Sequence, residues 1–332
     1  MPELNSQLPN RRFCVAPMLD WTDRHCRFFL RLVSQHVVLY TEMLTTGAIL
    51  HGDTERFLAM NAEEHPVALQ LGGSNPGDLA AACKLAEQYA YAEINLNCGC
   101  PSDRVQSGMF GAVMMKNAAI TADCVAAMRG AVDLPVTVKH RIGVDDYDSY
   151  DFLCQFVGTL SDAGCSTFVV HARKAWLKGL SPKQNREVPE LNYDRVYQLK
   201  RDFPDAEIII NGGITTLEQS MKHLNHLDGV MMGREAYTNP YILATVDQDI
   251  YGASHPVKSR EKIAEQFLDY IDNEMSKGTK LHAMTRHILG LFHGMPGARL
   301  FRRHISENAY KSTATIDVLT TALKATSGAM NK

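Results

Sequence analysis

The chain has 332 residues, of which 45% are hydrophobic and 21% charged, and its net charge at pH 7 is −3. This length allows one large domain with a smaller one, or two ordinary domains, and the composition is typical of a globular protein with ample core material. The net charge excludes a general polycation, the polar first 12 residues lack the apolar run of a secretory signal, and no run of about 18 apolar residues predicts a membrane span.

Eight short apolar runs recur along the first 250 residues, and nearly all are followed by a helical pattern. The runs are 13–19, 37–43, 67–73, 93–99, 136–143, 167–173, 207–214 and 229–235, and the clearer helices are 22–34, 76–89, 118–129, 150–163, 193–202 and 217–224. Near-continuous apolarity is typical of parallel strands buried on both faces. An open doubly wound sheet is the alternative, but no GxGxxG follows the first run. The sequence therefore predicts an α/β fold, a (β/α)₈ TIM barrel over residues 1–251.

After residue 251 the pattern becomes all-helical. Residues 252–256 (GASHP) are typical of a linker, and helical spacing follows over 258–276, 280–292, 297–310 and 315–326. We therefore expect a small helical bundle domain over residues 256–332. It holds 12 Lys and Arg against 7 Asp and Glu, a net +5, whereas residues 1–255 hold 22 against 30, a net −8. This asymmetry suggests an anionic partner such as nucleic acid, although ordinary variation in surface charge explains it equally well.

Polar or glycine residues end most of the predicted strands, where TIM barrels carry their catalytic groups. They include Asp20, Gln70, Asn95, Asn97, Cys100, Lys139, Arg141, His171, Arg173, Asn211, Gly212, Gly213, Gly233 and Arg234. The glycines after strands seven and eight let the backbone approach a ligand closely, and an arginine there suits phosphate. Because these two loops form the recurrent phosphate site of such barrels, we expect a phosphate-bearing cofactor. Two tight turns with a solvated arginine are the alternative.

The eight cysteines, at 14, 26, 83, 98, 100, 124, 154 and 165, show no CxxC pair and no zinc-like Cys/His spacing. Scattered thiols suit a reducing compartment, so we expect a cytoplasmic protein without a metal site.

Over essentially its whole length the sequence resembles the tRNA-dihydrouridine synthase family. The most specific segments are 97–102 (NCGCPS), 171–176 (HARKAW) and 181–187 (SPKQNRE); the last two, with 17–23 (PMLDWTD), resemble its A subfamily. The resemblance implies a flavin-dependent oxidoreductase with FMN as cofactor and NADPH as reductant. Its substrate would be tRNA, reduced at uridines 20 and 20a of the D-loop to 5,6-dihydrouridine. We expect a monomer that binds no membrane.

The resemblance also implies roles for individual residues. Reduction of uracil takes a hydride from the flavin onto C6 and a proton onto C5 from the opposite face, and a protonated thiol can supply that proton. By this likeness Cys100 is the proton donor, Asn97 grips the base, and Arg173 lies near the uracil carbonyls. Flavin contacts would come from Pro17, Met18, Leu19, Gln70, Lys139 and His171, and phosphate contacts from Asn211, Gly212, Gly213, Gly233 and Arg234. The tRNA contacts would come from Lys183, Arg186, Arg299 and Arg302.

One position departs from the expected pattern, because Cys98 stands where an aliphatic residue is expected; we assign it to packing. Two other functions compete with this interpretation. A flavin barrel that acts on a free pyrimidine would leave the basic tail without a purpose, and an RNA-binding barrel without catalysis would not need Cys100, Lys139 and His171.

Overall fold

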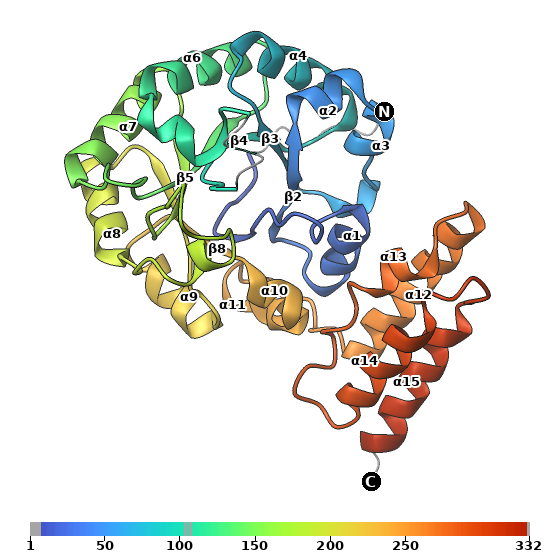
Figure 1. Ribbon diagram of the computed structural model, residues 1–332. Helices are drawn as coiled ribbons and strands as arrows, with labels where there is room; N and C mark the ends of the chain where they lie inside the picture. Colours follow the sequence, from blue (N-terminus) through green and yellow to red (C-terminus); the bar gives the residue numbers. More distant parts are fainter. Residues whose placement is uncertain (1–7, 103–104, 106–107, 331–332) are drawn as a thin grey trace. The chain divides into compact units, whose positions relative to one another are not determined.

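The computed structural model describes residues 8–102, 105 and 108–330, so residues 1–7 of the polar amino terminus lie outside it. Eight parallel strands close into a barrel in sequential order (Figure 1). They are β1 (Phe13–Val15), β2 (Val38–Thr45), β3 (Val67–Gly72), β4 (Glu93–Cys98), β5 (Val136–Arg141), β6 (Thr167–His171), β7 (Glu207–Asn211) and β8 (Gly229–Met232). β8 pairs with β1 and closes the barrel. The predicted (β/α)₈ barrel is confirmed. Seven of the eight predicted runs contain one strand each, and β2 overlaps the run 37–43 but continues to Thr45.

The strands end before most of the predicted runs do. β7 ends at Asn211 because Gly212 and Gly213 adopt φ angles of 116° and 70°, outside the β region. β6 likewise ends at His171, so Arg173 lies in the loop that follows. The polar residues at the ends of the runs therefore lie at the last ladder positions or just beyond them, as a barrel with functional strand ends requires.

Contacts within the chain divide it into two units. The first comprises Met1–Leu19 and Val38–Gly233 and contains the whole barrel. Its helices are α2 (Thr46–His51), α3 (Thr54–Leu58), η1 (Ala62–Glu64), α4 (Pro76–Ala86), η2 (Glu87–Tyr89), η3 (Gly111–Lys116), α6 (Ala118–Arg129), α7 (Tyr150–Asp162), η4 (Gln184–Arg186), α8 (Tyr193–Asp202) and α9 (Leu217–Leu224). In Figure 1 the longer of these surround the strands.

Polar side chains fix where the barrel helices begin. Asn75 accepts a hydrogen bond from the backbone N–H of Asp78 before α4, and Ser149 accepts one from Phe152 before α7. Thr216 and Gln219 form a reciprocal capping box at the start of α9. Such caps satisfy the orphan N–H groups of a first turn, which explains why these predicted helices begin within a residue or two of the expected positions.

The second unit comprises Asp20–Val37 and Arg234–Lys332. It contains α1 (Arg24–Val33), α10 (Arg234–Thr238), η5 (Pro240–Thr245), α11 (Val246–Asp249), α12 (Arg260–Ser276), α13 (Leu281–Thr285), α14 (Ala298–Asn308) and α15 (Asp317–Met330). The boundary by contacts thus lies at Gly233, before the expected residue 251, and α1 groups with the tail. Phe28 stacks on Tyr270 and Phe29 packs on Phe267, which ties α1 to α12. A division of labour between catalytic and RNA-binding parts stays a prediction.

The helix predicted over 280–292 is wrong beyond its first turn. α13 ends at Thr285, and successive turns follow, with i to i−3 hydrogen bonds such as Ile288 N to Thr285 O and His293 N to Gly290 O. Gly290 lies so close to the Thr238 carbonyl that a Cβ would come within 2.4 Å of its oxygen. This close packing, which helical spacing alone does not reveal, holds the segment in turns.

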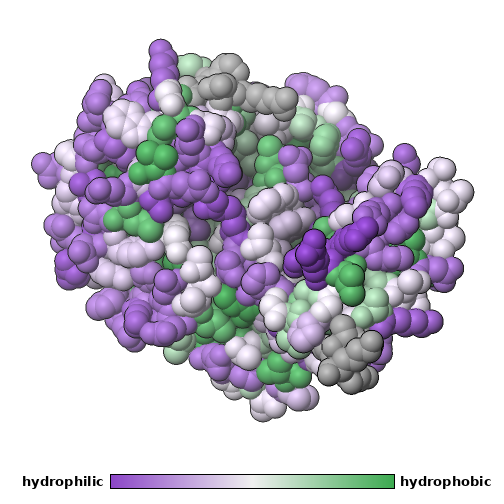
Figure 2. Space-filling view, turned by 60° about the horizontal axis from the view of Figure 1, so that its bottom comes forward, coloured by the Kyte–Doolittle hydropathy of each residue, from purple (hydrophilic) through white to green (hydrophobic). Residues whose placement is uncertain are grey.

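No helix in the described part of the chain is long and apolar enough to cross a membrane. On the face drawn in Figure 2, hydrophilic residues predominate and hydrophobic ones form separate patches.

Candidate active site

Predicted site residues from neighbouring strands lie side by side at the carboxyl end of the barrel. Asn97 of β4 pairs with Lys139 of β5, and His171 of β6 pairs with Asn211 of β7. Gln70 of β3 lies opposite Asn95 of β4. The sheet register therefore pairs polar residues that are between 25 and 42 positions apart in sequence.

Lys139 is held by the amide of Asn211. Its Nζ lies 3.1 Å from Asn211 Oδ1, and Asn211 Nδ2 donates to the Met231 carbonyl at 2.8 Å, which fixes the amide with its oxygen toward the lysine. Burial, and then the neighbouring Arg141, lower the pKa of Lys139 to about 7. An ammonium can donate three hydrogen bonds, and within the described residues Asn211 is its one acceptor. Lys139 is thus suited to donate to an anionic or carbonyl-bearing ligand.

His171 lies within a group of cations. Burial, followed by the charges of Arg141, Lys139, Arg173 and Arg186, lowers the pKa of His171 well below its usual value. The imidazole is therefore neutral at pH 7. Cations gathered around a neutral ring create a positive field, and such a field attracts anions.

The protein's own backbone and packing require glycine at two positions after β7 but not at the position after β8. At Gly212 a Cβ would come within 2.6 Å of the His171 ring, and at Gly213 within 2.5 Å of Leu191, and both have positive φ. Gly233 has neither constraint: its φ is ordinary for any residue, and a Cβ would meet only the Cβ of Ala16, at 3.9 Å. The protein's own packing therefore leaves space beside Gly233. Arg234 follows directly in the chain and begins α10.

Cys100 is the second residue of the loop after β4, and hydrogen bonds hold its backbone N–H and its carbonyl. Its N–H donates to Asn97 Oδ1 at 3.0 Å, its carbonyl accepts from Ala112 N at 2.9 Å, and its thiol lies 3.5 Å from Ser102 Oγ. Cys100 is half-buried, whereas Cys98 is fully buried, and burial raises the pKa of the Cys98 thiol well above its usual value. The Cys100 thiol is therefore the more accessible of the two, and Cys98 packs as a core residue.

Arg141 was noted at its strand end but given no role from the sequence. Its Nη1 donates to the Asn185 carbonyl at 2.9 Å, and its Nε donates to the Gly99 carbonyl at 3.2 Å. It therefore joins the loop before Cys100 to the loop after β6. Its place two residues after Lys139, on the same face of β5, was the available signal.

The remaining predicted residues are spread over both units. Arg173 donates to the carbonyls of Glu187 and Pro189, so its guanidinium braces the loop after β6. After β1, Pro17 and Met18 are half-buried and Leu19 is 64% exposed, which is unusual for leucine. The tRNA candidates Lys183, Arg186, Arg299 and Arg302 are all exposed: the first pair lies at η4 and the second on α14.

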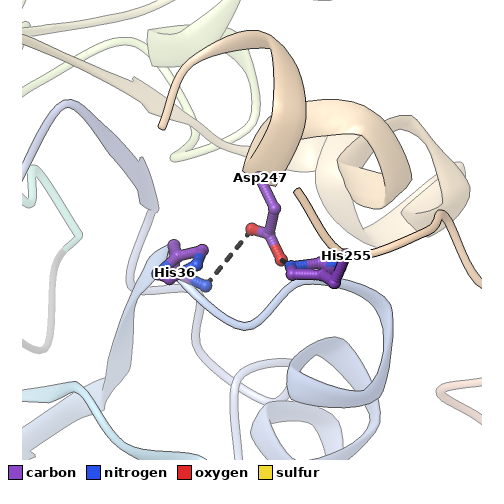
Figure 3. A group of neighbouring side chains, drawn as sticks. All are labelled: His36, Asp247 and His255. Carbon is purple, nitrogen blue, oxygen red and sulfur yellow. Dashed lines mark hydrogen bonds and ion pairs between the residues drawn. The ribbon is translucent and has the colours of Figure 1, made fainter. Parts of the chain in front are cut away.

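A His–Asp–His group lies in the second unit. Ligand atoms of His36, Asp247 and His255 fall within 4.8 Å of one another (Figure 3). However, buried Asp247 already accepts hydrogen bonds from Ser34 Oγ at 2.5 Å and from the backbone N–H groups of Gln35 at 2.6 Å and His36 at 3.2 Å. These donors engage both carboxylate oxygens, so the group is explained as a clamp on the turn after α1. The expected absence of a metal stays a prediction.

Comparison with known proteins shows which family has this sequence. Residues 14–327 match the family described as Dihydrouridine synthase (Dus). The chain is 62% identical, over 94% of its length and 95% of the relative's, to a protein of Vibrio cholerae named tRNA-dihydrouridine(20/20a) synthase. It is 61% identical to the Escherichia coli K12 protein of the same name, over 98% and 94% of the two chains.

Two solved structures resemble the fold at low sequence identity. A 2-naphthoyl-CoA reductase complex has a TM-score of 0.57 at 10% identity, over 73% of this chain and 51% of its own. An old yellow enzyme homologue from Zymomonas mobilis has a TM-score of 0.52 at 11% identity, over 76% and 92%. At such identities the likeness supports the barrel fold alone.

Proposed function

The chain belongs to the dihydrouridine synthase family, and from this premise we propose that it is a tRNA-dihydrouridine(20/20a) synthase that uses FMN and NADPH. The observation that supports this most is 61–62% identity to proteins of that name over nearly the full length. The half-buried Cys100, two residues after β4 and in electrostatic contact with Lys139 and Arg141, adds the chemistry that such an enzyme needs. We further propose that the enzyme is a cytoplasmic monomer with tRNA as its partner.

The residues present fit FMN. The space beside Gly233 suits a phosphate group, with Asn211, Gly212, Gly213 and Arg234 as the other proposed phosphate residues. Lys139 and Gln70 offer N–H donors to the carbonyl oxygens of the ring, with His171 beside them. Pro17, Met18 and the exposed Leu19 offer apolar surface. When bound, FMN supplies the hydride that uracil C6 receives, after reduction by NADPH.

The protein's own groups carry the other half of the chemistry. The Cys100 thiol gives its proton to C5 of the uracil, and Asn97 holds the base in place. Arg173 and the cations around His171 stabilise the negative charge that develops on the uracil carbonyl. Lys183, Arg186, Arg299 and Arg302 contact phosphates of the tRNA, which position the substrate without reading its sequence.

The proposed function is tested by mapping dihydrouridine in an unmodified tRNA transcript incubated with the protein and NADPH. We expect dihydrouridine at positions 20 and 20a, and none at a position where cytidine replaces uridine. Reduction of free uridine as fast as of tRNA would instead support a free-pyrimidine reductase. A colourless protein that binds tRNA without reducing it would support the non-catalytic alternative.

We expect Gly233→Ala to weaken FMN binding by about tenfold or more, because the added methyl group takes space that the proposed phosphate needs. The stability of the ligand-free protein should change by less than about 0.5 kcal/mol, since nothing in the protein opposes a Cβ there. Flavin fluorescence titration and urea unfolding measure the two effects. Gly47→Ala is the control, because a Cβ there meets no atom within 4 Å and Gly47 lies outside the proposed phosphate site. Unchanged FMN affinity in Gly233→Ala would contradict the proposed phosphate site.

We expect the stability of the ligand-free protein to rise between pH 7 and about pH 10.5 relative to a Lys139→Met variant. The pKa of Lys139 is lowered to about 7 in the folded chain, so within this window the unfolded chain binds the extra proton. The destabilising effect of the buried charge is fully present below pH 7 and disappears as the pH approaches 10.5. After allowance for partial exposure we expect a change of about 1–3 kcal/mol in the free energy of unfolding. A difference in free energy of unfolding between the two proteins that stays constant from pH 7 to pH 10 would contradict this prediction.

A further inference from the structure

A line of hydrogen-bonded, buried polar side chains runs through the barrel interior. One end is a carboxylate, which only accepts hydrogen bonds, and the other end is a pair of backbone N–H groups, which only donate them. The interiors of TIM barrels are mostly filled by branched aliphatic residues. In this barrel, however, the polar residues Glu93, Asn95 and Thr137 are fully buried, and Gln70 is 1% exposed. Glu93 begins β4, and its carboxylate pairs with the buried Arg11 at 2.5 Å. We call the connected residues Glu93, Thr137, Asn95, Gln70 and Asn97 the interior chain.

Each link of the interior chain is a hydrogen bond of ordinary length. Thr137 Oγ1 donates to Glu93 Oε1 at 3.0 Å and accepts from Asn95 Nδ2 at 2.8 Å. Asn95 Oδ1 accepts from Gln70 Nε2 at 2.8 Å, and Gln70 Oε1 accepts from Asn97 Nδ2 at 2.8 Å. Asn97 Oδ1 accepts from the backbone N–H groups of Gly99 and Cys100 at 3.1 and 3.0 Å. The interior chain therefore connects the Arg11–Glu93 ion pair with the backbone of Cys100.

The two ends of the interior chain require all its hydrogen bonds to run in one donor-to-acceptor direction. As the anionic partner of Arg11, the Glu93 carboxylate only accepts, so Thr137 must donate to it and can then only accept from Asn95. At the other end, the backbone N–H groups only donate, so Asn97 must turn its oxygen toward Cys100. Between these ends each amide has one orientation that satisfies both of its neighbours. Reversal of a single amide would set two donors or two acceptors against each other at a buried position, which is costly.

We propose that Glu93, Thr137 and Asn95 are positioning residues that fix the amide orientations of Gln70 and Asn97. In this orientation each of the two site amides has its oxygen engaged and one N–H left over. Both therefore offer a donor, which matches the carbonyl oxygens of a flavin ring and of uracil. This proposal rests on the proposed function for the identity of the ligands.

The test breaks the interior chain at a residue outside the proposed ligand contacts. Thr137→Val removes the hydroxyl with little change of shape, and Asn95 loses the acceptor that sets its orientation. We expect the FMN dissociation constant to rise at least tenfold and the visible absorption maximum of bound flavin to shift. Thr137→Ser keeps the hydroxyl. It should therefore restore the FMN dissociation constant to within about twofold of wild type and return the absorption maximum to its wild-type position.

Two control variants separate this effect from general loss of stability. Tyr40→Phe removes a hydrogen bond of 2.7 Å to the same Glu93 oxygen without interrupting the interior chain. Thr121 of α6 is equally buried, and Thr121→Val removes a hydroxyl that donates to the Met114 carbonyl. Both should keep the FMN affinity of wild type even if their free energy of unfolding falls as much as that of Thr137→Val.

Wild-type FMN affinity and spectrum in Thr137→Val would overturn the proposal, as would equal weakening in either control. If Thr137→Val does not fold, Asn95→Ala interrupts the interior chain at the next link, and a folded Asn95→Ala protein with unchanged affinity overturns it in the same way. Failure of the wild-type protein to bind FMN would instead refute the proposed function. The two failures are therefore distinguishable.

Discussion

Cys100→Ala is expected to slow reduction of tRNA uridine by about 10²–10⁴-fold, the usual contribution of a general acid. Flavin reduction by NADPH should stay near the wild-type rate, because that half-reaction needs no proton from the thiol. Cys100 is suited to this role because it is half-buried and its backbone is held by Asn97 and Ala112. Stopped-flow absorbance of the two half-reactions, measured separately, checks the split.

Cys98→Ala is the matched control for this experiment. It removes a thiol two residues away that is fully buried and packs in the core. We expect it to lower stability, while tRNA reduction keeps its rate in the protein that remains folded. Full activity in Cys100→Ala together with loss in Cys98→Ala would reverse the assignment of the proton donor.

The barrel was predictable because its strands are buried on both faces. Runs such as 207–214 have an uninterrupted aliphatic centre at residues 208–210, and polar caps such as Asn75 and Ser149 mark the helices between the runs. Both signals are local in sequence. The turns after α13 were missed because the constraint on Gly290 comes from the Thr238 carbonyl, more than 50 residues away.

The site was predictable as a set of strand-end residues, but its internal connections were not. That Lys139 and Asn211 are hydrogen-bonded, or that Arg141 joins two loops, depends on sheet register and on side-chain direction. The interior chain is hidden for the same reason, because Glu93, Thr137 and Gln70 lie in three separate runs of the sequence. A sequence pattern identifies each of them as an exception, and only the closed barrel makes them neighbours.

The grouping of α1 with the tail changes how the RNA-binding prediction should be tested. Deletion of residues 256–332 would remove α12, which carries the aromatic partners of Phe28 and Phe29 and the ion-pair partner of Arg24, Glu274. Loss of tRNA binding after such a deletion would then mix lost contacts with an unfolded α1. Point variants on the exposed face of α14 avoid this difficulty.

Arg299→Ala combined with Arg302→Ala is therefore expected to weaken tRNA binding and to flatten its salt dependence while the fold stays intact. The two side chains lie three residues apart on one exposed face of α14, whose opposite face buries Phe301 and Ile305. Each lost phosphate contact should lower the slope of log K against log salt by about 0.7–0.9, so the pair should lower it by between about one and two. Affinity measured across a salt series checks this. The double variant Lys262→Ala with Lys324→Ala removes the same charge from the same unit and should leave the slope nearly unchanged. An equal change in both double variants would mean that the tail acts through its net charge, and no change in either would assign tRNA recognition to the barrel loops around Lys183 and Arg186.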